Sequence, residues 1–522
     1  MLRGYRYLRD TNQLALLRDI NEQLAHATLI HNTKTVSVHI FGAAAEKADL
    51  VLRQYMMRRV AGINLNKVLL IALGDPTYKI SYPLPVAWRN ILRKNAFSVS
   101  GFFSALYWRA YLVYTCTTGV GKWFRTLVQN SKAGFREVEN FGKPYVFFSG
   151  LQKNNLPAYD ADGKSFDVFS WYLQANGRNA SAQVLCHAIP DAGDIKTKNV
   201  LIKSLPNQFP PLRGFVLQLR ALFWFLKALG IAFFHFFTGR WWNTLLFSEA
   251  VTASFVRLLP ANKLAADYMF HNSEWLYRPL WTYDAERAGA RIALYFYSTN
   301  IESFLRADGS SKQTGSWNII NWPVYFVWDQ YQADFLKREV ENIGEIFITG
   351  NVWFSSNAEQ VPVLHNKSIA VFDIAPCRPS FYVTLAQPLE YYTLTTAISF
   401  MEDIREPAAQ CGYQLVIKQK RTMGTLIEKR YKSYIDRISG VKEILVVNPE
   451  ISASRLIDKC DAVISMPFTS TALIGKELGK PSVYYDPTGM IQKNDPGAHG
   501  IMVLSKQQEL KEWLHKVMEP VS

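Results

Sequence analysis

Apolar runs alternate with amphipathic stretches along the last third of the chain. From Lys367 onward, runs such as SIAVFDIAP, YQLVIKQK and DAVISM are separated by stretches such as YYTLTTAISFMEDIREPAAQ, and the last pair is IMVL followed by KQQELKEWLHKVM. Short apolar runs indicate buried strands, and the stretches between them have the length and periodicity of helices. Residues 356–522 are therefore predicted to form a Rossmann-like lobe with a doubly wound parallel sheet.

The middle of the chain shows a similar but less regular pattern. Its apolar runs include PYVFFSG, RIALYFYSTN, WPVYFVWD and GEIFITG, and the helix-like QYQADFLKREVEN lies between the last two. Runs of this length that are rich in Val, Ile, Phe and Tyr are typical of buried strands. Residues 141–355 are predicted to form a second α/β lobe, interrupted by a hydrophobic helical insertion at 215–237.

Residues 1–140 have a mostly helical pattern with aromatic clusters such as SGFFSALYWRAYLVY. The first 29 residues carry charges every few positions and lack the apolar core of a signal peptide, so they are expected to form a helix of the mature protein. No catalytic signature occurs in this region. The predicted fold class is α/β, with two Rossmann-like lobes and a helical N-terminal region.

The insertion FVLQLRALFWFLKALGIAFFHFF at 215–237 is long enough to span a bilayer, but it carries two basic residues near its middle. Arg220 and Lys227 are seven positions apart and so share one helical face. A narrow basic stripe on an apolar helix suits a helix that lies in the membrane interface. Burial within the protein and a true membrane span are the alternatives.

Charge and cysteine content narrow the classes of partner. The 522 residues include 58 Lys and Arg against 43 Asp and Glu, a formal net charge of +15 that favours anionic partners. Nucleic acid is not expected, because the chain has no dense Lys/Arg tract and no zinc-finger spacing. The five cysteines are far apart and form no CxxC, which predicts neither a disulfide framework nor a thiolate metal site and favours a reducing cytoplasm.

The stretch DAVISMPFTSTALIGKELGKPSVYYDP contains the strongest candidate site. An apolar strand stops at Met466 and Pro467, and three hydroxyl side chains then open a helix. A helix N-terminus offers unpaired N–H groups and a positive dipole end, so this turn can hold a phosphate. The alternative is a plain N-cap, since Ser and Thr are preferred caps whatever the function.

Ligands of parallel sheets bind at the carboxyl ends of the strands, so the residues that follow successive strands should converge on one crevice. Basic and hydroxyl side chains there would hold phosphate, and an Asp would accept hydrogen bonds from a ribose or base. The predicted donor-binding residues are Asp373, Lys418, Lys420, Arg421, Pro467, Phe468, Thr469, Ser470, Thr471 and Asp486.

Two carboxylates, Glu274 and Asp284, are the candidate catalytic bases. Both lie among aromatic residues before an expected strand, and a carboxylate in such a setting can act as a general base. Helix capping or solvation is the alternative for each. His187, His235 and His271 lack metal-ligand spacing and are interpreted as structural. The absence of GxGxxG, GxxxxGK[ST] and nucleophile-elbow motifs argues against dinucleotide oxidoreductases, P-loop kinases and serine hydrolases.

The stretch SMPFTSTALIGKELGKPSVYYDP, together with RPLWTYDAERAGARIALYFYSTN, resembles the bacterial surface-polysaccharide biosynthesis proteins named for their Pro-Phe-Thr-Ser motif. More distantly, it is similar to capsule and sialic-acid-type transferases of the GT-B fold. The resemblance runs from about residue 140 to the C-terminus. It implies two Rossmann-like lobes, with a donor nucleotide on the C-terminal lobe and the acceptor on the N-terminal one.

The resemblance leaves the donor nucleotide open. Relatives that use CMP-linked sugars contact the donor through a Ser/Thr cluster and a His-Pro pair. Thr469, Ser470 and Thr471 match the cluster, but Lys418-Gln419-Lys420 stands where the His-Pro pair is expected. A CMP-linked nonulosonic acid is the first candidate donor and a UDP-sugar the second.

The expected function is a glycosyltransferase that builds bacterial surface polysaccharide such as O-antigen or capsule. Its expected partners are a nucleotide-sugar donor, a glycan or lipid-linked acceptor and the inner-membrane surface, with which the cytoplasmic protein would associate peripherally. No cofactor or metal is expected, since no DxD-like carboxylate pair ends a strand. The alternatives are a nucleotide-sugar epimerase of the same architecture and a non-catalytic scaffold of a polysaccharide assembly complex.

Overall fold

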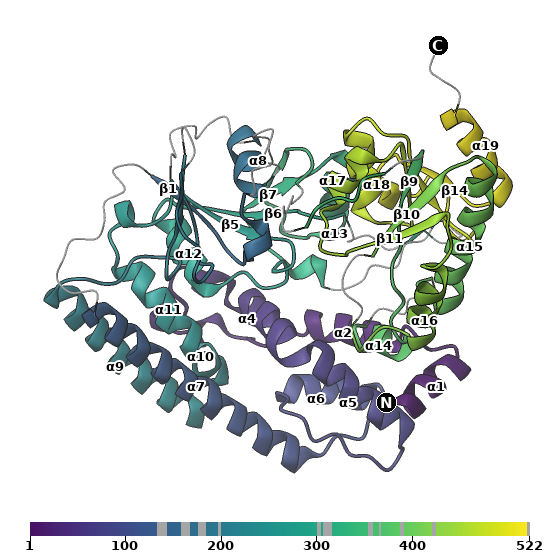
Figure 1. Cartoon of the computed structure of the whole chain (residues 1–522). Coiled ribbons are helices and arrows are strands. Elements are labelled where there is room, and N and C mark those ends of the chain that lie inside the picture. Colours follow the sequence, from purple (N-terminus) through teal and green to yellow (C-terminus); the bar gives the residue numbers. More distant parts are fainter. Residues whose placement is uncertain are drawn as a thin grey trace.

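Two α/β lobes lie side by side on a base of helices in the computed structural model of the chain (Figure 1). The structure describes residues 1–132, 144–157, 167–175, 184–196, 200–299, 304–305, 309, 316–352, 359–364, 367–386, 391–419 and 424–518. The predicted α/β class with two parallel sheets and a helical N-terminal region is confirmed.

The N-terminal lobe is built on an eight-stranded sheet. Its strands are β1 (Tyr145–Phe148), β2 (Val184–His187), β3 (Ile195–Lys196), β4 (Leu201–Ser204), β5 (Asp267–His271), β6 (Arg291–Tyr295), β7 (Val324–Val327) and β8 (Glu345–Ile348). The order is β3-β4-β2-β1-β5-β6-β7-β8, and every neighbouring pair is parallel except β3 with β4. The strand order therefore reverses between β1 and β5. Helices α8 (Val168–Ala175), α12 (Leu280–Arg287) and α13 (Gln330–Glu339) belong to this lobe.

The C-terminal lobe has a six-stranded, fully parallel sheet. Its strands are β9 (Ser368–Phe372), β10 (Gln414–Lys418), β11 (Ile444–Val447), β12 (Ala462–Ser465), β13 (Ser482–Tyr485) and β14 (Met502–Leu504). The order β11-β10-β9-β12-β13-β14 is that of a doubly wound fold, with its switch point between β9 and β12. Its helices are α14 (Pro379–Thr384), α15 (Leu394–Gln410), α16 (Lys429–Ile438), α17 (Ala453–Lys459), α18 (Ser470–Glu477) and α19 (Gln507–Met518).

The burial of the strands explains why the sequence pattern predicted the strands of the C-terminal lobe. All residues of β9 and β12 are buried, because helices cover both faces of a parallel sheet, and such strands appear in the sequence as continuous apolar runs. Strands β2, β4 and β5 and helix α8 were not among the predicted elements. Their runs are short or broken by polar residues, such as Asp267 and His271 at the two ends of β5.

The N-terminal region forms the helical base. Its helices are α1 (Leu2–Asp10), α2 (Leu16–His26), α3 (Val38–Phe41), α4 (Ala48–Met56), α5 (Gly62–Gly74), α6 (Val86–Lys94) and α7 (Gly101–Lys132). The single helix expected over the first 29 residues is two helices, separated at residues 11–15. Both Leu8 and Leu17 are buried, and the break between the two helices allows each to face the core.

The hydrophobic insertion joins this base rather than standing apart from the protein. Helix α9 (Phe215–Phe237) packs against α7 and against α10 (Trp241–Leu245) and α11 (Phe247–Leu258) (Figure 1). Trp123 stacks on Phe225 with ring centroids 4.2 Å apart. Within the described residues α9 is the one helix long and apolar enough to cross a membrane, and 22% of its most apolar stretch is buried.

The carboxyl edges of the two sheets face each other. Phe304, in the segment after β6, packs against Phe468 after β12 with ring centroids 5.3 Å apart, and against Tyr391 at 4.9 Å. A second contact joins the loops after β7 and β13, where His499 Nδ1 lies 2.7 Å from Asp329 Oδ2. Phe304, Phe468 and Asp329 lie in segments that follow carboxyl ends of strands, so these ends of the two sheets lie on the facing sides of the lobes.

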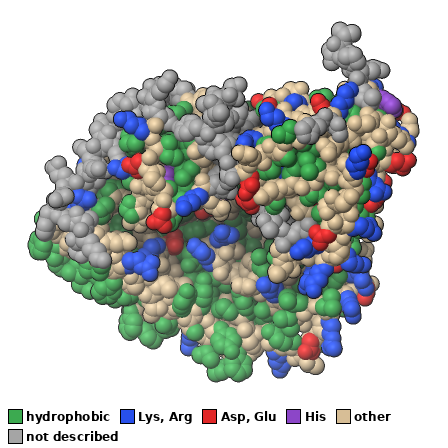
Figure 2. All heavy atoms as spheres, in the orientation of Figure 1, with side chains coloured by type: hydrophobic (Ala, Val, Ile, Leu, Met, Phe, Trp, Pro, Cys, Tyr) green, Lys and Arg blue, Asp and Glu red, His purple; other side chains and the backbone are tan. Residues whose placement is uncertain are grey.

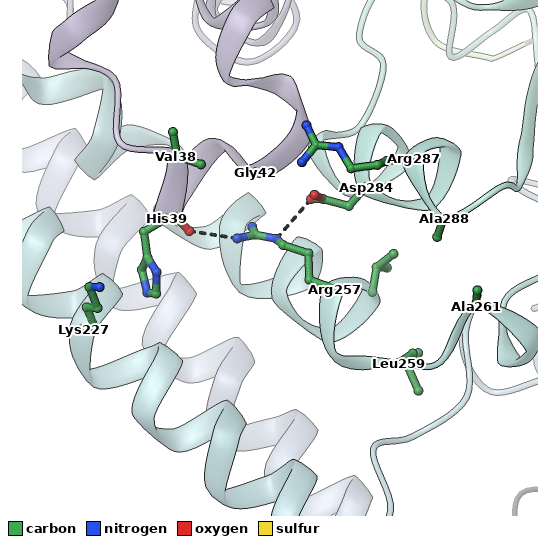
Figure 3. A pocket seen from close by; sticks show the side chains of 11 residues that line it. Val38, His39, Gly42, Lys227, Arg257, Leu259, Ala261, Asp284, Arg287 and Ala288 are labelled. Atoms are coloured by element: carbon green, nitrogen blue, oxygen red, sulfur yellow. Dashed lines mark hydrogen bonds and ion pairs between the residues drawn. The ribbon is translucent and has the colours of Figure 1, made fainter.

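An ion pair ties the helical base to the N-terminal lobe. Arg257 of α11 lies 3.1 Å from Asp284 of α12, measured from Nε to Oδ2, and its guanidinium also donates to the His39 carbonyl at 2.9 Å (Figure 3). The Ala43 N–H donates to Asp284 Oδ1 at 3.0 Å. Gly42, with φ 56° and ψ −131°, makes this approach possible, since a Cβ there would lie 2.6 Å from the carboxylate oxygens.

We expect Gly42→Ala to lower the free energy of unfolding by about 2 kcal/mol or more, from an unfavourable backbone conformation plus the clash with Asp284. Gly62→Ala is the matched control, because Gly62 also has a positive φ of 52° but open space around its Cβ position. Chemical denaturation of both variants measures the difference. Equal losses would mean that the close approach at Gly42 contributes nothing.

Candidate functional site

The C-terminal half of the candidate site lies at the switch point between β9 and β12. These strands are direct neighbours, with Ser465 opposite Phe372, so the residues that follow them are adjacent. Asp373 follows β9, and the Pro-Phe-Thr-Ser segment follows β12. Ligands of doubly wound sheets bind in the crevice at this position. The sheet order therefore brings together two of the predicted donor-binding elements.

The hydroxyl cluster starts α18 without capping it. Thr469 is the N-cap residue, yet its side chain makes no capping hydrogen bond. Its hydroxyl instead lies 3.0 Å from that of Thr471, which lies 2.9 Å from that of Ser465. The side chain of Ser470 is half-buried and makes no hydrogen bond within the described part of the chain. The first N–H groups of α18 and the Ser470 hydroxyl are thus available to an anion.

Pro467 and Phe468 hold this turn in place. Both are buried, the Pro467 carbonyl accepts a hydrogen bond from the Tyr392 hydroxyl at 2.8 Å, and the Phe468 ring packs 5.4 Å from that of Tyr484. Their side chains are occupied by packing within the lobe and against Phe304. In this structure they position the motif, and their predicted contact with a donor stays a prediction.

Asp373 is a fully buried carboxylate beside the motif. Burial raises its pKa to about 6, although the hydrogen bond from the Tyr431 hydroxyl and the nearby Lys418 act in the opposite direction. Its Oδ1 atom is buried with no hydrogen-bond partner among the described residues. This unsatisfied oxygen is suited to accept a hydrogen bond from a ligand hydroxyl or amide.

The other predicted donor-binding residues have different positions. Lys418 ends β10, is buried, and donates from Nζ to the carbonyls of Pro449 at 3.0 Å and Gln419 at 3.3 Å, and burial lowers its pKa. Lys420 and Arg421 lie outside the described residues. Both oxygens of Asp486 accept hydrogen bonds from its own loop, so this carboxylate orders the segment after β13.

The N-terminal half of the candidate site lies at the other switch point, between β1 and β5. Ser149 follows β1, and its hydroxyl donates to Glu274 Oε2 at 3.3 Å. A Cβ at Gly150 would lie 2.4 Å from His271 Nε2 and 3.3 Å from Glu274 Oε1, so only glycine allows this close approach. Glu274 is half-buried, as a proton acceptor in a crevice should be.

His271, interpreted from the sequence as structural, lies beside the candidate base, a position that the sequence did not predict. It ends β5 three positions before Glu274, and its Nδ1 accepts a hydrogen bond from the Ser273 N–H at 3.3 Å. Burial lowers the pKa of His271, against the opposing effects of Glu274 and a hydrogen bond to the Gly150 backbone. The imidazole is therefore neutral at pH 7 and fixes the loop that carries Glu274. A position at the end of a strand would have marked His271 as a candidate site residue, but strand β5 was not predicted from the sequence.

Asp284, the other candidate base, lies elsewhere. It is in the middle of α12, buried, and paired with Arg257 of the helical base rather than placed at a strand end. Burial raises the pKa of Asp284, and Arg257 and the Ala43 N–H oppose that rise. The geometry thus favours Glu274 as the base, while Asp284 has a structural partner on each oxygen.

Within the described ranges, no three His, Cys, Asp or Glu side chains gather as metal ligands. The expectation that the protein needs no metal or cofactor stays a prediction.

Two Rossmann-like lobes with facing carboxyl edges define a two-lobed, GT-B-like α/β protein. The chain belongs to the family described as polysaccharide biosynthesis PFTS motif proteins, whose model matches residues 222–514. The matched range contains the motif, the candidate base, the whole C-terminal sheet and strands β5 to β8 of the N-terminal sheet. No curated protein sequence matches the chain.

Solved structures with a similar arrangement include three from different organisms. The UDP-GlcNAc 2-epimerase from Methanocaldococcus jannaschii is 9% identical, with a TM-score of 0.38, covering 72% of this chain and 93% of that one. The trehalose-phosphate synthase (UDP-forming) from Burkholderia vietnamiensis is 11% identical, with a TM-score of 0.34 and coverages of 72% and 92%. A ugt transferase from Siraitia grosvenorii in complex with UDP is 11% identical, with a TM-score of 0.34 and coverages of 72% and 91%.

We expect Asp373→Asn to stabilise the protein more at pH 7.5 than at pH 5. The folded-state pKa of Asp373 is raised to about 6, so its contribution to stability is full below its ordinary pKa and is lost as the pH rises through about 6. An amide has no such loss, and a shift of about two units corresponds to roughly 2–3 kcal/mol at most. Thermal melts of both proteins across this range measure the effect. Parallel pH curves would contradict it.

Proposed function

We propose that this protein is a glycosyltransferase of bacterial surface-polysaccharide biosynthesis, for example of O-antigen or capsule. It transfers a sugar from a nucleotide-activated donor to a glycan or lipid-linked acceptor, without a metal or cofactor. A CMP-linked nonulosonic acid is the first candidate donor and a UDP-sugar the second. Membership of the polysaccharide biosynthesis family supports the pathway class, and the site geometry supports the reaction.

The observation that carries the proposal is the uncapped start of α18 at the switch point. Within the described residues, Thr469 at the N-cap position makes no capping bond, the Ser470 hydroxyl is unengaged, and Asp373 Oδ1 has no partner one strand away. Together these groups leave a phosphate cradle beside an unsatisfied oxygen. In the proposed complex the donor phosphate lies on the N–H groups of α18. Asp373 accepts a hydrogen bond from the nucleoside.

The reaction proposed is direct displacement. The acceptor oxygen forms a bond to the anomeric carbon while the bond from that carbon to the donor phosphate oxygen breaks. Glu274 takes the proton of the acceptor hydroxyl, with Ser149 and His271 positioning its carboxylate. The phosphate leaves as an anion, which the N-terminal N–H groups of α18 stabilise.

The reaction is proposed to take place in the cytoplasm at the surface of the inner membrane. Large apolar side chains of α7 and α9 are exposed, including Phe102, Phe103 and Tyr114 on α7 and Phe215 and Phe237 on α9. Figure 2 has apolar side chains over the lower-left edge and the bottom of the molecule, where these helices lie. Residues 76–132 and 195–248 contain no Asp or Glu but 15 Lys and Arg, a charge balance that suits anionic lipid.

The first test replaces Ser470. Because a charged phosphate loses one hydrogen bond, we expect Ser470→Ala to weaken nucleotide affinity about tenfold while the melting temperature changes little. Calorimetric titration with CMP, UDP, GDP and CDP identifies the nucleotide and measures the loss. Ser452→Ala is the control, since Ser452 is the N-cap residue of α17 in the same lobe, after the edge strand β11 and away from the switch point.

Equal nucleotide affinity in Ser470→Ala and Ser452→Ala would show that the start of α18 does not bind the donor phosphate. Failure of all four nucleotides to bind would favour the scaffold alternative. Conversion of a nucleotide-sugar in the absence of any acceptor would favour the epimerase.

The second test replaces the proposed base. We expect Glu274→Gln to reduce kcat by about a hundredfold or more with nucleotide affinity unchanged, because an amide cannot take up the acceptor proton. Turnover of the parent protein should persist in excess EDTA. Asp284→Asn is the discriminating variant, and we expect its main effect to be a lower melting temperature through loss of the charge partner of Arg257.

Turnover lost in folded Asp284→Asn but retained in Glu274→Gln would assign the base to the other carboxylate. Turnover that EDTA abolishes would contradict the metal-independent mechanism.

A further inference from the structure

A cavity of about 650 Å³ lies where the helical base meets the N-terminal lobe. Four helices contribute its main side chains: Val38 and His39 from α3, Lys227 from α9, Arg257 from α11, and Asp284 and Arg287 from α12 (Figure 3). Val38, Lys227 and Arg287 are exposed, so the cavity is open to solvent on that side. It is separate from the switch points of both sheets, where the proposed transfer takes place.

The charges in this cavity do not balance. Arg257 is engaged by Asp284 and by the carbonyls of His39 and Ile40, so that pair contributes no net charge. Lys227 and Arg287 form no side-chain hydrogen bond or ion pair with any residue that the structure describes. Burial lowers the pKa of His39, and its ring is bonded to the Trp224 carbonyl, so it adds no charge at pH 7. The cavity thus has an excess of two positive charges.

The rigid pair gives this cavity a fixed wall. Arg257 lies between Lys227 and Arg287 in Figure 3 and is fixed by three acceptors. Gly42 lines the cavity as well and lets the backbone approach Asp284. Two unpaired cations on opposite sides of a preformed wall are an arrangement that favours a compact, multiply charged anion such as a phosphate or diphosphate.

An apolar surface leads up to the mouth of the cavity. Val38 lines it and is 66% exposed, and Phe223, one helical turn before Lys227 on α9, is 64% exposed. In Figure 2 several Lys and Arg side chains gather on the front face, above the apolar lower-left edge. A free inorganic anion would need no such surface, whereas a lipid with a terminal phosphate needs both parts.

We infer that this cavity binds the phosphate or diphosphate head of a lipid whose chain lies along the exposed apolar face of α9. This inference rests on the proposed function. The acceptor would be a lipid-linked glycan that is held by its phosphate at the membrane surface. Lys227 and Arg287 bind the anion, and the pair of Arg257 and Asp284 holds the wall between them. The site is distinct from the donor phosphate cradle at α18.

The experiment uses the full chain and dodecyl phosphate below its micelle concentration, with affinity measured by calorimetry. We expect Lys227→Gln and Arg287→Gln each to weaken binding about tenfold, the usual scale for one charged hydrogen bond. Arg220→Gln is the matched control, because Arg220 is an exposed base on the same helix but does not line the cavity. It should change affinity less than twofold. Melting temperatures of the three variants should stay close to that of the parent, since neither Lys227 nor Arg287 forms a hydrogen bond or ion pair with a described residue.

Three results would overturn the inference: no binding of dodecyl phosphate, equal losses in Arg220→Gln and the two cavity variants, or inorganic pyrophosphate binding as tightly as dodecyl phosphate. The second would mean diffuse attraction to the basic face, and the third a site for a free anion. The nucleotide titration tests the proposed function separately from this inference. If nucleotides bind and dodecyl phosphate does not, only this inference fails, and if dodecyl phosphate binds as expected without nucleotide binding, the cavity remains a lipid-phosphate site.

Discussion

The packing of Phe304 among aromatic rings of the other lobe is the contact on which the candidate site depends. Its ring lies 4.9 Å from Tyr391, 5.7 Å from Tyr392 and 5.3 Å from Phe468, measured between centroids. Phe304 and Phe468 lie in segments that follow the carboxyl ends of β6 and β12, whereas Tyr391 and Tyr392 lie between α14 and α15. Because parallel strands place all their carboxyl ends on one edge, contacts such as this one and the pair of His499 and Asp329 set the two edges against each other. The two switch points then lie on the facing sides of the two lobes.

Burial has one consistent effect on the ionisable groups at these switch points. It raises the pKa of Asp373 and lowers those of Lys418 and His271, so in each case the neutral form is favoured. With a pKa of about 6, Asp373 is still mostly ionised at pH 7, so an anion at this switch point depends on oriented dipoles at the start of α18. The N–H groups of α18 and the hydroxyls of Thr469 to Thr471 provide such dipoles, and they need no reorganisation when charge develops on a leaving phosphate.

The helical base forms a second face of the protein, apart from the candidate site. The pair of Arg257 and Asp284 joins α11 to α12 and so fixes the base to the N-terminal lobe. A buried ion pair adds little net stability, because desolvation offsets much of the attraction, but its geometry fixes how the two elements are placed. Here that placement puts the apolar face of α9 beside the basic cavity. In the proposed function, this placement would bring membrane contact and acceptor binding together on one side of the protein.

The sequence by itself determined the C-terminal lobe and the chemistry of its motif. Continuous apolar runs separated by amphipathic stretches predicted β9 to β14 and most of their helices, because both signals are local. The hydroxyl cluster and Glu274 were likewise visible as residue types. Three things depended on contacts between distant residues: the switch-point order that brings Asp373 beside the motif, the pairing of α7 with the insertion about 100 residues later, and the partner of Asp284. The sequence also could not show the position of His271, because strand β5 was not predicted. Nor could it show that Thr469 makes no capping bond, because that depends on side-chain geometry. A linear pattern records which residues are apolar or charged, but only the folded chain decides which of them meet.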